Sequence, residues 1–260
     1  MNTVATEDIT LVDRFEYIIR LADDNLIYSH RLAQWMTWAP QLEEDVALAN
    51  ISLDLLGQAR NLLTYAAEVE GEDNTEDDLA YLREEQDFRC CLLVEQPMQH
   101  EFGDEMARLL FFSAYTVPLW EGLSQGRDSR LAEIAAKSLK EARYHLEHAA
   151  DWVIRLGDGT DESHRRMQAG LANMWPWAGE LFLSDQLMDK LVRAGVAVDP
   201  VQLNETWQQT VGAVAARATL QVPTTPQRPG TGRRGVHSEH LGYVLAEMQY
   251  LHRLHPGARW

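Results

Sequence analysis

The histidines are the first residues to test, because a metal centre in a helical protein needs imidazole and carboxylate groups at fixed spacing. A di-iron centre in a four-helix bundle takes one Glu from each of two helices and a Glu-x-x-His pair from each of two others. The residues three places before the nine histidines are Ile27, Pro97, Ala142, His145, Asp161, Arg234, His237, Gln249 and His252. None of them is Glu, so the ligand pattern of a complete di-iron site is missing.

Three residues remain as candidates for a degenerate metal site. Glu141 and His145 are one helical turn apart, and Asp54 lies in another expected helix. One interpretation is a single weak metal site or a general base. The other is a buried hydrogen-bond network, since neighbours at this spacing interact on any helix and buried polar groups need partners. We favour the network without a metal, and we expect Arg60 and Arg143 to supply the positive charge that a metal would bring.

Residues of reactive type also occur outside these helices. Cys90 and Cys91 are candidate nucleophiles, but the sequence places no base beside them, and packing in the core is the plainer interpretation. Ser238, between His237 and Glu239, has the type of a helix N-cap, and the histidines around it can cap or pair locally.

The segment 221–236 is rich in proline and glycine and carries Arg228, Arg233 and Arg234. In so acidic a chain, these arginines could hold the phosphates of a nucleotide-like ligand or an acidic partner. A solvated linker is an equally good interpretation. Both predict an exposed basic loop.

Apolar residues recur at alternating spacings of four and three in three long segments, which is typical of helices packed nearly parallel in a bundle. Two of these segments run from Phe15 to Met36 and from Leu131 to Leu156. The third contains Leu42, Val46, Ala49, Leu53, Leu56, Arg60, Leu63 and Ala67. Seams of this length predict the long helices of a four-helix bundle.

Proline and glycine divide the rest of the chain into further helices. No segment alternates as a strand does, so we expect an all-α fold: one domain over 1–260, a long four-helix bundle with additional C-terminal helices. A glycine stop at 157–159 should end the helix that starts near 131. The other expected helices cover 77–95, 102–123, 162–193 with a kink near Pro176, 201–219 and 238–254.

The composition excludes several classes of function. Forty acidic against 23 basic residues give a formal charge of −17, which argues against non-specific binding of nucleic acid or anionic membranes. Two adjacent cysteines cannot form a disulfide framework. The N-terminus has no secretory pattern, and no apolar segment is long enough to span a bilayer. We therefore expect a soluble, cytoplasmic protein without nucleic-acid or membrane partners.

Three stretches are similar to one known family. They contain LDLLGQARN at 53–61, KEARYHL at 140–146, and GVHSEHLG followed by LAEMQYL within 235–251. They resemble the C subunits of bacterial 1,2-phenylacetyl-CoA epoxidases, multicomponent ring-oxygenating enzymes of phenylacetate degradation. The similarity runs from about Asp23 to Trp260.

The resemblance implies a ferritin-like fold and a role in a larger enzyme. In that family, the C subunit is the structural partner of the catalytic A subunit, which carries the di-iron centre, and its own metal site has decayed. The system also includes a small B subunit and a reductase that passes electrons from NADPH through flavin and iron–sulfur groups. The complex inserts one oxygen atom of O2 into the ring of phenylacetyl-CoA. The resemblance therefore implies no cofactor in this chain, with substrate at or near its interface.

The family's contacts with the CoA ester map onto two short segments. The resemblance places them at Asp87, Phe88, Arg89 and Cys90, and at Asp189, Lys190 and Leu191. Arg89 and Lys190 are of a type that binds phosphate, although solvated helix charges would look the same. Two other functions stay open: an oxygenase in its own right that uses Asp54, Glu141 and His145, and a homodimeric acyl-CoA-binding module.

Overall fold

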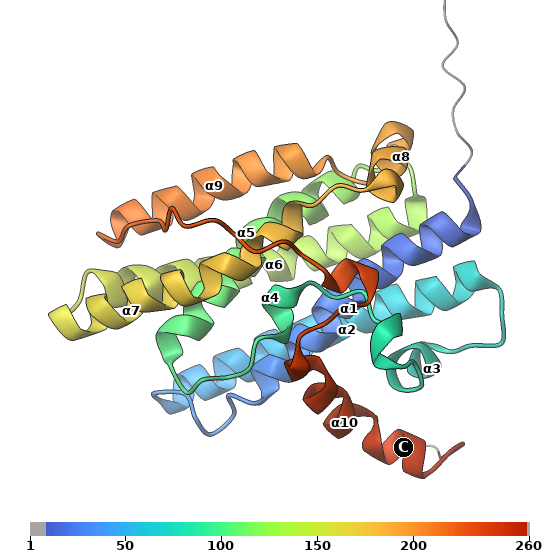
Figure 1. The fold of residues 1–260 in the computed structure, drawn as a ribbon, viewed down its shortest axis with the longest axis horizontal. Helices are drawn as coiled ribbons and strands as arrows, with labels where there is room; N and C mark the ends of the chain where they lie inside the picture. The colour runs from blue at the N-terminus through green and yellow to red at the C-terminus, as the bar shows by residue number, and fades with distance from the viewer. Residues whose placement is uncertain (1–8, 259–260) are drawn as a thin grey trace, which may run out of the picture.

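Four long helices form the centre of the protein (Figure 1). The computed structural model describes residues 9–258, and in this range the chain forms helices and loops without a strand. The central helices are α1 (Leu11–Ala33), α2 (Leu42–Glu70), α5 (Phe102–Leu123) and α6 (Ser129–Gly157). α1 packs on α2, α5 packs on α6, and α2 contacts α6, so the two hairpins form a four-helix bundle. The expected all-α bundle is confirmed.

Local sequence defines the ends of these helices. The Thr10 hydroxyl accepts a hydrogen bond from the Asp13 amide at 3.1 Å, and the Asp13 carboxylate accepts one from the Thr10 amide at 2.8 Å. This reciprocal pair is a capping box that begins α1. α2 ends at Gly71, whose φ of 72° lies in the left-handed region. At the start of α6, the Asp128 side chain accepts from the Leu131 amide.

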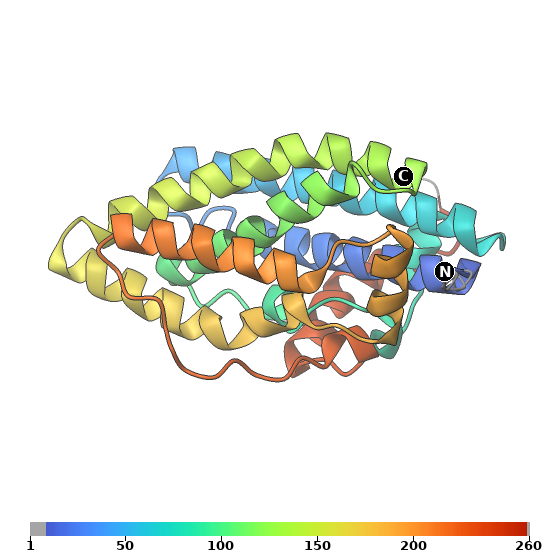
Figure 2. The ribbon, with the colours of Figure 1, turned by 90° about the horizontal axis from the view of Figure 1, so that it is seen from above.

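A second group of helices covers α5. α7 (Asp161–Met174) and α9 (Pro200–Arg217) run along α5, as the view from above shows (Figure 2). The 3₁₀ segment η2 (Trp175–Phe182) follows α7, and α8 (Gln186–Ala194) contacts α1.

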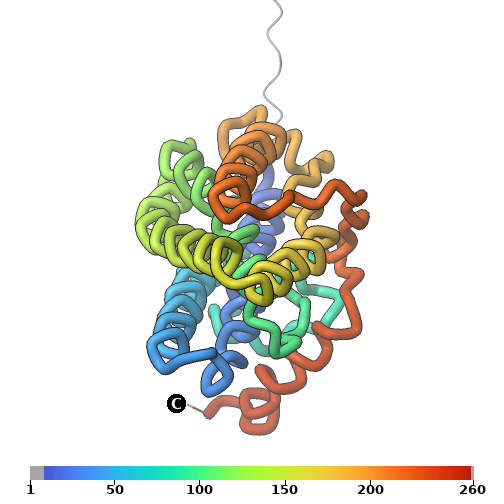
Figure 3. The backbone as a smooth tube through the Cα atoms, turned by 90° about the vertical axis from the view of Figure 1, so that its left-hand side faces the viewer, coloured from blue at the N-terminus to red at the C-terminus, as the bar shows by residue number. Residues whose placement is uncertain are grey.

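The remaining elements are short or C-terminal. They are α3 (Glu76–Tyr81), η1 (Glu85–Asp87), α4 (Leu92–Glu95), η3 (Gly232–Arg234) and α10 (Glu239–Leu254). Of these, α3 packs on α2, whereas α4 and α10 contact α1. α10 packs on α3 and α1 and lies on the side of the bundle opposite α9 (Figure 3).

The prediction of one helix over 77–95 is wrong, because α1 holds this segment in a less regular path. The backbone amide of Arg89 donates to Asp23 at 2.7 Å, and that of Cys91 donates to Asp24 at 2.8 Å. An amide that binds a side chain of another helix cannot also close a helical turn. The segment is therefore divided into α3, η1 and α4.

The prediction of one kinked helix over 162–193 is also wrong. Pro176 lacks an N–H and ends the regular α-helix at its position, and η2 with the following loop separates α7 from α8. The Glu180 carboxylate of η2 accepts hydrogen bonds from the amides of Leu92 and Arg233 at 2.8 and 3.0 Å. The break thus places a buried carboxylate against two distant loops.

α6 ends where expected, but not by a left-handed glycine. Asp158 is its C-cap, with φ −96°. Gly157 instead lets the end of α9 come close, because a Cβ on Gly157 would lie 2.4 Å from the carbonyl oxygen of Ala218.

The expected seams are confirmed for two of the three long segments. Residues at the seam positions of α1 and α6 are mostly buried. The α2 seam is wrong over its first half, because Leu42, Val46 and Leu53 are 73%, 54% and 64% exposed. α2 buries its other apolar face, which carries Leu48 and Ile51, so the expected seam lies on the outside of the bundle.

The crossing of α5 and α7 depends on two glycines. A Cβ on Gly170 would lie 2.4 Å from the carbonyl oxygen of Gly103. We expect Gly170→Ala to lower the free energy of unfolding by about 1–3 kcal/mol, measured by denaturant titration, because backbone must move to admit the methyl group. Gly212→Ala is the control: it meets nothing within 4 Å in α9 and should stabilise by about 0.5–1 kcal/mol. Equal stabilities of the two variants would contradict this packing.

Candidate functional site

The side chain of Glu105 is the centre of a buried polar cluster between α1 and α5. Tyr28 donates to its Oε1 at 3.0 Å, and Trp35 donates to its Oε2 at 2.6 Å. Arg108, one turn further along α5, forms an ion pair with the same carboxylate. Burial, followed by the charge of Glu105, raises the pKa of Tyr28 well above its usual value. The phenol therefore stays protonated and acts as a hydrogen-bond donor.

The interior does not fit the di-iron centre that a ferritin-like fold can carry. The buried residues of α6 within the described chain include no carboxylate. The most deeply buried carboxylates of α1 and α5 already have cationic partners: Asp23 pairs with Arg83, Asp24 with Arg233 and Glu105 with Arg108. A two-metal site needs carboxylates from all four helices that are free to bridge the ions, and this arrangement does not provide them.

Asp54, Glu141 and His145 belong to contacts between α2 and α6. His145 Nε2 lies 3.0 Å from Asp54 Oδ2, and Gln58 donates to Glu141 Oε2 at 2.9 Å. Glu141 and His145 therefore pair with different residues of α2 and not with each other. The absence of a metal at these residues stays a prediction. The expected role of Arg60 and Arg143 is wrong, because these exposed side chains pair with Glu76 and Glu121. The buried guanidinium of Arg108 supplies the positive charge inside the bundle instead.

Two of the four residues in the first expected CoA-contact segment are inaccessible. Phe88 and Cys90 are fully buried, so neither side chain presents a surface in the isolated chain, and their contact with a CoA ester stays a prediction. The Arg89 guanidinium donates to Glu16 at 3.1 Å and to two backbone carbonyls. The Asp87 carboxylate accepts a hydrogen bond from the backbone amide of Glu84. This segment serves to attach the chain to α1.

The second expected segment lies partly at an open cavity of about 950 Å³. Asp189 and Lys190 line it together with Asp13, Asp185, Gln186, Leu187 and Arg193. Leu191 is fully buried in the isolated chain, and its contact with a CoA ester stays a prediction. Lys190 Nζ lies 2.6 Å from Asp13, and a phosphate would have to compete with that carboxylate.

A row of ion pairs along the first turns of α1 connects the two segments. Asp13 holds Lys190, Glu16 holds Arg89, and Arg20 holds Asp185 at 2.8 Å. Glu16 also accepts from Arg20 at 3.2 Å. The structure therefore brings the two predicted segments onto neighbouring parts of α1, but their cations already face carboxylates.

Asp13 makes the stability of this region depend on pH. Hydrogen bonds from Lys190 and Thr10 lower its pKa to about 2. A lowered pKa in the folded state stabilises the fold above the unfolded value of roughly 4, and this stabilisation is lost as the pH falls toward 2. We expect Asp13→Asn to flatten the pH dependence of unfolding between about pH 4 and 2, measured by thermal melts. An unchanged acid slope would contradict the assignment.

The segment 221–236 keeps Arg228 and Arg234 exposed, but the prediction of an exposed basic loop is wrong for Arg233, whose side chain is only 13% exposed. Arg233 donates to Asp24 at 2.6 and 3.0 Å and to the carbonyls of Arg20 and Arg89. Arg228 lies over the Trp177 ring, with 4.3 Å from guanidinium carbon to ring centroid. The burial of Arg233 could have been anticipated from Asp23 and Asp24, because two adjacent carboxylates on an apolar helix face need cationic partners inside the protein.

The cysteines do not form a nucleophilic site. Both are fully buried, and burial raises the pKa of each thiol well above its usual value. A thiol that is neutral and inaccessible is not a nucleophile. Sequence reasoning missed, however, that His237 Nδ1 lies 3.9 Å from the Cys90 sulfur.

The fold and the interior define a ferritin-like helical bundle whose described residues do not form a di-iron ligand set. A family model described as phenylacetic acid catabolic protein matches residues 2–260. The chain belongs to this family. It is 49% identical over 244 residues to the C subunit of the 1,2-phenylacetyl-CoA epoxidase of Escherichia coli (strain K12), a match that covers 94% of this chain and 98% of that protein. The resemblance seen in the sequence is confirmed.

Two further findings concern location and assembly. No helix in the described part of the chain has the length and apolar character needed to cross a membrane. The name of the E. coli relative makes that protein one subunit of an enzyme with several.

Proposed function

We propose that this protein is the non-catalytic structural subunit of a multicomponent phenylacetyl-CoA 1,2-epoxidase, and that it pairs with and stabilises the di-iron catalytic subunit. The observation that carries the proposal is an apolar row on the outer face of α2. We define the α2 row as Leu42, Val46, Ala49, Leu53 and Leu56, of which all but the half-buried Ala49 are exposed.

The spacing of the α2 row indicates what kind of surface covers it. Its residues are four, three, four and three positions apart, which is the repeat by which one helix packs nearly parallel to another. Such a repeat has no function on a helix whose outer face meets only water. Trp38, in the turn before α2, and Tyr144, on α6, are also exposed, and aromatic side chains are enriched at interfaces between proteins. The α2 row therefore favours a helical partner.

The catalytic subunit is the occupant that we propose for this surface. The related E. coli protein is itself part of a larger enzyme. The interior of this chain uses its carboxylates for ion pairs, which supports a scaffold over an oxygenase in its own right. In this proposal the iron belongs to the catalytic A subunit, and electrons from NADPH reach it through the flavin and iron–sulfur groups of the reductase, with the B subunit in the same complex. The residues of this chain hold the bundle together and present the α2 row.

The arrangement supports a separate acyl-CoA-binding module less well. The cavity beside α8 contains Asp13, Asp185 and Asp189 against Lys190 and Arg193. A CoA ester carries several phosphate charges, and a surface with more carboxylates than cations repels them. We therefore place substrate binding in the assembled complex rather than in the isolated chain.

Charge in the α2 row should weaken the complex. We expect Leu53→Glu to raise the Kd for the catalytic partner by at least about 30-fold, since truncating an interface hot spot costs about 2 kcal/mol or more. Leu53 is 64% exposed in the isolated chain, so its replacement should leave the fold intact. Binding is measured by calorimetry with the two purified proteins, and folding by circular dichroism and the melting temperature.

Leu251→Glu is the matched control, because Leu251 on α10 is 55% exposed and lies outside the α2 row. Its affinity for the catalytic partner should equal that of the unmodified chain. Equal affinities of the Leu53 and Leu251 variants would contradict docking on α2. Light scattering on the isolated chain tests the other occupant: a homodimer that Leu53→Glu dissociates, without any binding of the catalytic partner, would assign the row to a second copy.

A further inference from the structure

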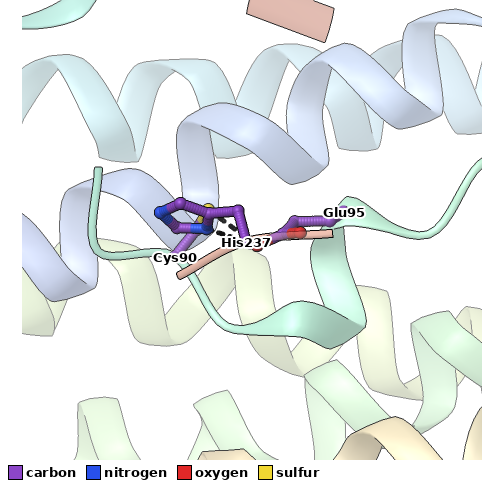
Figure 4. Close-up of side chains that lie close together, drawn as sticks. All are labelled: Cys90, Glu95 and His237. Atoms are coloured by element: carbon purple, nitrogen blue, oxygen red, sulfur yellow. Dashed lines mark hydrogen bonds and ion pairs between the residues drawn. The ribbon is translucent and has the colours of Figure 1, made fainter. Parts of the chain in front are cut away.

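Three side chains of metal-binding type, none of them part of the α2 row, meet in the core beside α1 (Figure 4). His237 Nδ1 lies 2.6 Å from Glu95 Oε1. The Cys90 sulfur lies 3.7 Å from the same oxygen and 3.9 Å from the same nitrogen. Cys90 lies two residues before the short helix α4 and Glu95 is its last residue, whereas His237 comes from the loop before α10. In the described chain, these residues form the one group of three His, Cys, Asp or Glu side chains whose donor atoms converge within 4.8 Å.

Hydrogen bonds on the outer side of the group orient its donor atoms inward. His237 Nε2 lies 3.0 Å from the Phe88 carbonyl oxygen and can only donate to it. That bond leaves Nδ1 as the nitrogen that faces Glu95 and Cys90. Glu95 Oε2 accepts from both the amide and the hydroxyl of Ser238, at 2.8 and 2.7 Å, and so Oε1 faces inward. Ordered partners behind each ligand are characteristic of protein metal sites.

The hydroxyl of Ser238 donates to Glu95 instead of capping helix α10. Ser238 occupies the N-cap position of α10, but its side chain makes no capping bond there. The sequence-based interpretation of Ser238 as an ordinary cap is therefore wrong in its mechanism. Its hydroxyl supports Glu95 across 143 positions of sequence.

We propose that Cys90, Glu95 and His237 form a mononuclear binding site for Zn²⁺. A thiolate, an imidazole and a carboxylate are the three ligand types that zinc takes in proteins. With Zn–S near 2.3 Å and Zn–N or Zn–O near 2.0–2.1 Å, ligand atoms of a tetrahedral ion lie roughly 3.3–3.6 Å apart. The two sulfur distances are within a few tenths of an ångström of this range, and the pair of Glu95 and His237 has to open by about 0.7 Å.

The ion would have a structural role and would be independent of the proposed pairing with a catalytic subunit. Both His237 and Glu95 have fully buried side chains, so the three protein ligands enclose the ion and leave one position of the tetrahedron to a non-protein ligand. A buried divalent cation balances the charges of one thiolate and one carboxylate. It would join the loop before α10 to the segment around α4, and enclosure means that it would enter as the chain folds.

Metal analysis of the full chain tests this site. The protein is produced in zinc-supplemented medium, passed over a desalting column and analysed by mass spectrometry for zinc and iron together. We expect about one zinc per chain and a higher melting temperature than for protein that has been unfolded and refolded with a strong chelator, because an ion bound only by the folded state stabilises it. Substitution with Co²⁺ should give the thiolate charge-transfer band and the intense visible bands of a tetrahedral site.

The adjacent cysteines provide a matched pair of variants. Cys90→Ala should reduce the zinc content to below about one-tenth of the unmodified value, because a ligand is lost, and should remove the cobalt charge-transfer band. Cys91→Ala removes an equally buried thiol that lies outside the group and should retain the zinc. Zinc absent from the unmodified chain, or zinc content unaffected by Cys90→Ala, would overturn the proposal. No catalytic partner is present in this experiment, so neither result bears on the proposed docking of that partner on the α2 row.

Discussion

Arg233→Met should lower the free energy of unfolding by about 3–5 kcal/mol, because it leaves the carboxylate of Asp24 buried without its cation. The Arg233 and Asp24 side chains are 13% and 3% exposed, and the same guanidinium also satisfies two backbone carbonyls on α1 and beside α4. Loss of these bonds should detach the second half of the 221–236 segment from the bundle. Denaturant titration measures the stability. Hydrogen exchange should be faster at the Cys91 amide, which donates a hydrogen bond to Asp24.

The neighbouring arginine makes a sharp control for this prediction. Arg234 is exposed, and within residues 9–258 its side chain donates only to the Gly230 carbonyl, at 3.3 Å. Arg234→Met should therefore change the stability by less than about 0.5 kcal/mol. Asp24→Asn combined with Arg233→Met should recover part of the loss, since the unpaired charge is removed. Similar stabilities of the two single arginine variants would contradict a buried ion pair at Arg233.

Arg108→Met should have an effect of the same size, about 3–5 kcal/mol, because it leaves Glu105 charged in the middle of the bundle. The two side chains are 2% and 1% exposed. Tyr28 and Trp35 would still donate to the carboxylate, but neutral donors do not offset a full buried charge. The loss is measured by denaturant titration.

Two variants separate the loss of charge from the loss of packing. Glu105→Gln combined with Arg108→Met should be more stable than Arg108→Met alone, because the site then holds no charge. Arg143→Met removes an arginine that is 58% exposed and paired with a 62% exposed Glu121, and it should cost less than about 1 kcal/mol. If Arg108→Met were as mild as Arg143→Met, the interior would not depend on this guanidinium.

The long helices could be predicted from the sequence, because their apolar periodicity and their end signals are local. The seams on α1 and α6 are buried as expected, and α5 has the predicted bounds of 102 and 123. The segment 82–91 could not be predicted, since its path depends on backbone bonds to Asp23 and Asp24. Periodicity also cannot tell which of two apolar faces of α2 is buried. The same repeat of apolar residues arises whether a helix face packs against the core or against a partner protein.

The missing di-iron ligand pattern could be predicted from the sequence, but the residues that form the buried polar contacts could not. The sequence shows that the Glu-x-x-His pairs are missing, and in the structure His145 pairs with Asp54 while Glu141 pairs with Gln58. The choice of Arg60 and Arg143 as the compensating cations was wrong, because sequence spacing does not show which arginines point inward. The contact of Cys90 with His237 spans 147 positions, and no local pattern reveals a contact of that range.

Iron analysis tests the central claim most directly. The chain is purified alone and in complex with its catalytic partner, and the iron in each preparation is measured per chain. If this chain is a structural subunit whose buried carboxylates are paired with arginines, the isolated chain should contain essentially no iron. The complex should contain iron, and this iron should stay with the catalytic partner when the two proteins are separated. About two iron ions per isolated chain, the content of a di-iron centre, would contradict the account and make this protein an oxygenase in its own right.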